Sequence, residues 1–223
     1  MRRGLWLVAL TCLGASVSAQ SRFHPAEFRG GPMPTISIEA VGGGQVFLEL
    51  AVTRDGSVAD VKPLRATPPF TPAFVAAARS WRFRPAEQLT ESPDRTRPAV
   101  WNPVDATVLV GGIIRPPALL GPTLGQPPQD VGSAAADTPL PIGVIEPPFP
   151  PRARGDGSVL VQVMIDAGGR VSDAKVLQSS PAFDDAALTA ARAWTFRPAR
   201  VRGELVSAYA YLVFGFRQPV TTK

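Results

Sequence analysis

The heptapeptide SWRFRPA occupies Ser80–Ala86, and the closely similar AWTFRPA occupies Ala193–Ala199. Sliding the sequence by 113 residues aligns the two. It also extends the agreement to 18 identities in 43 positions between Gly44–Ala86 (copy one) and Gly157–Ala199 (copy two), without a gap. The chain therefore contains an internal duplication. Its period is longer than the 20–50 residues of a solenoid repeat, so we expect the copies to fold as two separate domains.

Each copy predicts the same order of secondary structure. Alternating apolar residues, bounded by glycine turns, indicate two strands, near 46–52 and 58–64 in copy one. A helix follows, because Phe74, Ala77, Ala78 and Trp81 share the i, i+3, i+4, i+7 spacing of one helical face. A closing strand completes each copy, at 104–113 and 207–217. The expected fold class is α+β, with two tandem ββαβ domains, each a three-stranded antiparallel sheet packed on one helix.

The repeated heptapeptide is interpreted first as a packing motif. In this interpretation the tryptophan ends the apolar helix face, the phenylalanine continues the core, and the proline prevents the helix from continuing. The motif residues are Trp81, Phe83 and Pro85 in copy one, and Trp194, Phe196 and Pro198 in copy two.

Proline-rich sequence separates the copies. The segment 115–151 contains 11 prolines in 37 residues, which disfavours a regular helix or a central strand. We therefore predict domains at 36–114 and 147–219, joined by a Pro-rich linker at 115–146. The insertion between Glu87 and Asn102 in copy one, which is rich in proline, arginine and acidic residues, is predicted to be a loop.

The N-terminus has the three parts of a secretory signal peptide. Arg2 and Arg3 precede an apolar run of about 13 residues, and small residues precede Gln20. We predict a signal peptide at 1–19; an uncleaved membrane anchor through 4–19 is the alternative. Cys12, the only cysteine, lies inside this segment, so the mature chain would contain no disulfide. Cleavage would also lower the net charge from +5 to +3 by removing two arginines.

The residue content offers little for catalysis. His24 is the only histidine, no metal-ligand spacing occurs, and the Asp184-Asp185 pair is typical of a helix start. The arginines are scattered and several lie beside acidic residues, which argues against a nucleic-acid groove reader. We therefore expect no enzymatic activity, no cofactor and no nucleic-acid partner.

Copy two resembles the C-terminal domain of the TonB family over roughly Pro147–Gln218. The resemblance rests on Phe149-Pro150, Gly157-Ser158-Val159, Gly168-Gly169-Arg170-Val171, Ser179-Ser180, Phe183-Asp184, Ala186-Ala187, Ala193–Ala199, Gly203, Val206 and the Phe-rich closing strand. Copy one matches from Gly44 to Ala86 and then departs through its insertion, and it has Ala66-Thr67 in place of the serine pair.

The resemblance implies a periplasmic, non-enzymatic energy-transducer domain linked to transport across the outer membrane. Members of the family pair an edge strand with a short segment of an outer-membrane transporter, a mode in which main-chain hydrogen bonds supply much of the affinity. A transducer also keeps an N-terminal membrane helix with a functional histidine, whereas His24 lies outside the apolar run here. The alternative is a free periplasmic scaffold protein that reuses the domain without coupling to the motor.

The partner-binding hypothesis concerns the closing strand of copy two. As the last strand of a three-stranded sheet it would have one free side, and it carries the only two tyrosines of the chain. Tyr209, Tyr211 and Val213, with Arg197 nearby, are the candidate contacts for a protein partner; the alternative is that the tyrosines only shield the sheet. Free strand edges would also allow a homodimer.

Overall fold

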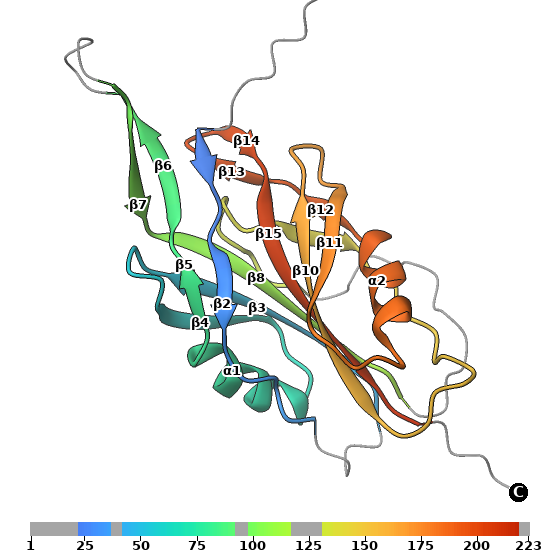
Figure 1. Ribbon diagram of the computed structural model, residues 1–223. Helices are drawn as coiled ribbons and strands as arrows, with labels where there is room; N and C mark the ends of the chain where they lie inside the picture. The colour runs from blue at the N-terminus through green and yellow to red at the C-terminus, as the bar shows by residue number, and fades with distance from the viewer. Residues whose placement is uncertain (1–21, 37–41, 92–97, 117–130, 219–223) are drawn as a thin grey trace, which may run out of the picture.

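The computed structural model describes residues 22–36, 42–91, 98–116 and 131–218 (Figure 1). The predicted signal peptide at 1–19 lies outside these residues. The elements are β1 (Phe23–His24), β2 (Glu27–Gly30), β3 (Gly44–Val52), β4 (Val58–Arg65), α1 (Phe70–Arg79), β5 (Arg82–Arg84), β6 (Ala86–Thr90), β7 (Val100–Val104), β8 (Ala106–Ile114), β9 (Leu140–Gly143), β10 (Gly157–Ile165), β11 (Val171–Gln178), α2 (Asp184–Arg192), β12 (Thr195–Arg197), β13 (Ala199–Val201), β14 (Glu204–Val206) and β15 (Ala208–Phe216). None of the helices in these ranges is long and apolar enough to cross a membrane.

The two copies share one six-stranded sheet, in the order β11-β10-β15-β8-β3-β4. Each copy contributes an antiparallel group of three strands, as the sequence predicts. The closing strands β8 and β15 then pair with each other in parallel, from Leu109↔Ala210 to Ile114↔Gly215. The expectation of two separate sheets is therefore corrected: both closing strands are long, apolar and buried, and each covers the side of the other that would have been exposed.

The helices lie on opposite faces of this sheet. Alternate residues of a strand point to opposite faces, and β3 illustrates this. Its Leu48 and Leu50 belong to the same buried cluster as Phe74 of α1. Its Phe47 belongs to the second cluster, with Ala190 of α2. A two-fold rotation about an axis parallel to the strands relates this arrangement of the two copies, because such a rotation keeps β8 and β15 parallel and exchanges the faces.

The structural repeat begins earlier than the repeat in sequence. The indole Nε1 of Trp81 donates a hydrogen bond to Pro32 O at 2.9 Å, and that of Trp194 donates to Ile145 O at 2.9 Å. The acceptors are again 113 residues apart. The same offset relates the pairing of β2 with β5 to that of β9 with β12. The segments before each copy are therefore structural equivalents, although their sequences do not align.

Each preceding segment pairs with its own copy and also contacts the other half. Residues before copy one pack on copy two: Gln178 Nε2 donates to Gly31 O at 2.8 Å, and Phe28 N donates to the Tyr211 hydroxyl at 2.7 Å. Part of the predicted linker packs on copy one, where Ala135 N donates to Glu49 Oε2 at 2.6 Å. The linker prediction thus missed an ordered segment from 131 to 146, whose prolines fit because β9 pairs on one side only.

The insertion of copy one forms a hairpin rather than the predicted loop. β6 and β7 pair from Ala86↔Val104 to Thr90↔Val100, and β1 adds to the other side of β6. The hairpin projects from the body of the molecule (Figure 1). The His24 ring stacks on Trp101 with centroids 3.8 Å apart. The corresponding hairpin of copy two, β13–β14, is much shorter.

Candidate functional site

The closing strand of copy two, predicted to have a free side, lies in the middle of the sheet. β15 pairs with β10 along its whole length and with β8 over six residues. Tyr211 and Val213 are both fully buried. This corrects the premise of the partner-binding hypothesis, because the main chain of this strand has no unpaired side on which to receive a peptide.

Tyr211 has a structural task in this position. Its hydroxyl accepts a hydrogen bond from Phe28 N at 2.7 Å and donates one to Ala26 O at 3.2 Å. It thereby fixes the N-terminal segment across copy two. Burial, which disfavours the phenolate, raises the pKa of Tyr211 well above its usual range. The side chain is therefore neutral at any physiological pH.

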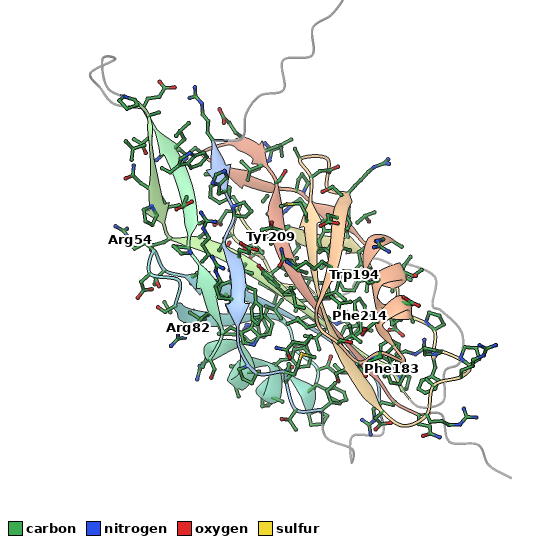
Figure 2. The ribbon with its side chains drawn as sticks, in the orientation of Figure 1. Arg54, Arg82, Phe183, Trp194, Tyr209 and Phe214 are labelled. Atoms are coloured by element: carbon green, nitrogen blue, oxygen red, sulfur yellow. The ribbon has the colours of Figure 1, made fainter. Side chains whose placement is uncertain are left out.

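The other two candidate residues, Tyr209 and Arg197, lie in different parts of copy two. Tyr209 is partly buried, with its ring 6.5 Å from that of Tyr211, and it is visible near the middle of the molecule in Figure 2. Burial also raises its pKa. Arg197 is exposed on β12, and its guanidinium is 3.4 Å from Ala135 O. The structure does not gather the four candidates into one exposed surface.

The tryptophan and phenylalanine of each heptapeptide occupy core positions, as expected of a packing motif, and Pro85 and Pro198 are partly buried. Trp81 and Trp194 have exposed fractions of 0% and 1%, and Phe83 and Phe196 are also buried. Figure 2 shows Trp194 near Phe214, whose ring centroid is 6.1 Å from that of the indole. With their indole nitrogens bonded to carbonyl groups, neither tryptophan presents a surface to a partner.

The edges of the shared sheet are β4 and β11, which are equivalent strands of the two copies. The edge at β4 is obstructed. Pro63 lies in this strand and has no main-chain N–H to donate to a further strand, and edge strands are where sheets usually accommodate proline. Gly132 N donates to Leu64 O at 2.7 Å, and the Lys62 ammonium donates to Ser133 O at 2.9 Å. The ordered segment after residue 131 therefore occupies part of this edge.

The edge at β11 is open. Val176 is the equivalent of Pro63. Val176 lies opposite Val161 of β10, and Pro63 lies opposite Leu48 of β3, which is the equivalent position in copy one. Within the described ranges, no strand pairs with the outer side of β11. Ser172, Asp173 and Lys175 are exposed. Sequence reasoning missed this edge because it assigned the free side of copy two to the closing strand, but the Pro63/Val176 difference is visible in the aligned repeat.

The remaining chemistry of the described residues is sparse. They contain no group of three or more His, Cys, Asp or Glu side chains that could hold a metal ion. The carboxylate with the most perturbed titration is Asp55, in the β3–β4 turn. Hydrogen bonds from the Thr53 hydroxyl and from the Ser57 main chain and hydroxyl lower the pKa of Asp55 to about 2. These bonds stabilise the turn itself.

Comparison with known families supports the resemblance of copy two. Residues 146–217 match the family model described as Gram-negative bacterial TonB protein C-terminal. The match begins one residue after Ile145 and ends just after β15, so it covers copy two from β10 to β15 and leaves out β9. It supports a TonB C-terminal domain there and does not support a second one in copy one. This family consists of periplasmic energy-transducing proteins rather than enzymes. The search of curated proteins gives no match to the chain.

Proposed function

We propose that this protein acts in the periplasm by binding an extended segment of a partner protein, which adds as a new strand to the outer side of β11. The carrying observation is the open edge of β11, in the half of the chain that matches the TonB C-terminal family. Strand addition requires a row of unpaired N–H and C=O groups. Of the two edges of the shared sheet, only β11 combines such a row with an exposed surface.

We further propose that the partner is an outer-membrane transporter and that binding serves energy-dependent transport. The family match supports this assignment, because the domain links the cell envelope to energy transduction. In this scheme copy one is the supporting half of the binding protein. Its strand β8 covers β15, and its N-terminal segment is fixed to copy two by Tyr211.

The second candidate function is a periplasmic interaction protein without coupling to a motor. It is favoured by the place of His24. The only histidine of the chain, His24, belongs to β1 and stacks on Trp101 of the hairpin, so it is part of the folded domain and not of an N-terminal membrane helix. Both functions use the same edge and differ in the protein that they bind.

A photo-cross-linking residue at Ser172, on the open edge, tests the proposal in cells. Position 59 is the matched control, because Ala59 occupies the same place on β4 and is also exposed. We expect a cross-link to a short segment of an outer-membrane transporter from position 172 and much less from position 59. Cross-linking to a soluble periplasmic protein would favour the second function. Equal yields from both positions would contradict the choice of edge.

Val176→Pro provides a main-chain test of the same edge. The substitution copies Pro63, so the fold of β4 already accommodates a proline at this place. We expect the variant to fold, as checked by circular dichroism, and to lose the cross-link from Ser172 because one N–H of the edge is gone. A folded variant that keeps the full cross-link would show that β11 does not pair with the partner.

A further inference from the structure

The open edge carries a charge pattern that is complementary to itself. Along β11, Asp173 and Lys175 are both exposed and flank the buried Ala174. They lie opposite Met164 and Gln162 of β10, two residues apart on that strand, so both side chains extend from the same face of the sheet. An antiparallel strand that placed a lysine opposite Asp173 and an aspartate opposite Lys175 would pair with both charges. Read in the reverse direction, β11 is such a strand.

We propose that β11 pairs antiparallel with β11 of a second copy of this chain, in a register centred on Ala174. A two-fold axis through the centre makes the contact isologous and closed. Asp173 of each copy then lies opposite Lys175 of the other, which gives two equivalent ion pairs on one face. Ser172 lies opposite Val176, and Ala174 lies opposite its own equivalent. The two six-stranded sheets become one continuous sheet across the dimer.

The charges of Asp173 and Lys175 favour this register over the registers shifted by two residues. A shift that centres the pairing on Asp173 or on Lys175 places two like charges directly opposite each other, which is destabilising in a sheet. Shifts by one residue would turn the side chains of one strand to the wrong face. The small side chain of Ala174 also lets the strands approach at the axis. The sequence of β11 therefore specifies a single arrangement with its own copy.

The equivalent strand of copy one cannot do the same, although it has the same charges. Asp60 and Lys62 repeat the pattern on β4. There Pro63 removes a donor, and the Lys62 ammonium is already held by Ser133 O at 2.9 Å and lies 3.7 Å from the Glu49 carboxylate. The duplication thus left one edge obstructed and the other open, so pairing stops at two chains and does not continue into a fibre.

This inference rests on the proposed function only in that both use the outer edge of β11. Self-pairing covers the edge while no partner is bound, and a partner segment must displace the second copy. Partner binding and dimer formation are therefore mutually exclusive, and the number of copies paired falls as partner is added.

Sedimentation equilibrium of the purified chain, residues 20–223, over a range of concentrations tests the dimer. We expect a monomer–dimer equilibrium. Asp173→Lys places lysines opposite each other at both symmetric positions and should weaken dimerisation about tenfold or more. Asp60→Lys, the same change on β4, is the matched control and should have no effect. The double variant Asp173→Lys/Lys175→Asp restores opposite charges in the proposed register and should restore the dimer.

Each outcome decides the matter. A chain that stays monomeric at every concentration overturns the proposal, as does equal weakening by Asp173→Lys and Asp60→Lys, or a double variant that remains as weak as Asp173→Lys. Val176→Pro must abolish the dimer if the main chain of β11 forms it. The charge variants keep the main chain of the edge, so loss of self-pairing with a retained partner cross-link from Ser172 separates this proposal from the proposed function. A dimer that persists without any partner cross-link would contradict only the proposed function.

Discussion

Replacing Tyr211 by phenylalanine should destabilise the whole molecule, although it removes a single oxygen atom. That oxygen accepts a hydrogen bond from Phe28 N and donates one to Ala26 O, across a sequence separation of more than 180 residues. A net hydrogen bond contributes about 1 kcal/mol, and a buried main-chain group left without a partner costs about 1–3 kcal/mol. We therefore expect the free energy of unfolding to fall by about 2–4 kcal/mol.

Urea unfolding, followed by tryptophan fluorescence and by far-ultraviolet circular dichroism, measures this loss. For a chain of this length a change of about 3 kcal/mol corresponds to a fall in Tm of roughly 6–12 °C. Both probes should report the same midpoint, because Tyr211 joins the two copies. Tyr209→Phe is the matched control. Its side chain is only partly buried, so water can take the place of the hydroxyl, and we expect a change below about 0.5 kcal/mol.

Alkaline pH gives a second measurement on the same group. The pKa of Tyr211 is raised in the folded state, so its contribution to stability is complete below the unfolded pKa of about 10 and is lost as pH rises above it. Tyr211→Phe should therefore flatten the fall in stability above about pH 10. A loss as small as that of Tyr209→Phe, together with an unchanged alkaline profile, would refute the role assigned to this hydroxyl.

Three further outcomes are expected. Cleavage at a protease site engineered within residues 121–130 should leave two fragments that co-elute in gel filtration, because they share one sheet; fragments that separate without denaturant would contradict the shared sheet. Trp194→Ala should lower the free energy of unfolding by about 3–5 kcal/mol, and Trp81→Ala by a similar amount, since each empties a buried indole site; near-normal melting temperatures would show that the indoles are dispensable. Asp55→Asn should reduce the loss of stability between about pH 4 and pH 2, because the wild-type carboxylate, with its pKa lowered to about 2, contributes stability above the unfolded pKa that is lost as it protonates; an unchanged acid unfolding profile would exclude this carboxylate.

Much of the local structure could be predicted from the sequence. Alternation identified the long strands, and the spacing that ends at Trp81 identified the helix of copy one. These signals are short in range, since they depend on side chains that repeat every two or 3.6 residues along one element. The resemblance of copy two rests on the same local features, and the family match over 146–217 agrees with it.

The association of the copies could not be predicted in the same way. Nothing in the alternation of β15 states that its second side is covered by β8, because a closing strand at an edge and one in the centre can both be apolar. β15 carries Ala210, Leu212 and Phe214 on one face and Tyr211 and Val213 on the other, and all five are buried. A strand buried on both faces was a signal of a central position, and the sequence reasoning interpreted its tyrosines as partner contacts instead.

The candidate site moved for the same physical reason. With β15 in the centre of the shared sheet, the remaining edge of copy two is β11, on the far side of β10. The obstructed edge differs from the open one in the segment after residue 131, which bonds to β4, and in one residue of the strand itself, Pro63 in place of Val176. That difference is present in the aligned repeat, but it becomes informative only when the strand order is known.

The hydrogen bonds between Phe28, Ala26 and Tyr211 also set an order of events during synthesis. The N-terminal segment is made first, yet its binding surface on β15 is made almost last. The segment can pair with β5 and β6 once these are made, but its hydrogen bonds to Tyr211 must wait until nearly the whole chain has been synthesised. Contacts this distant in sequence slow folding, and here they postpone its completion until both copies are present. A chain truncated before β15 should be unable to close its first core, so premature termination should yield material that proteases remove rather than a functional half.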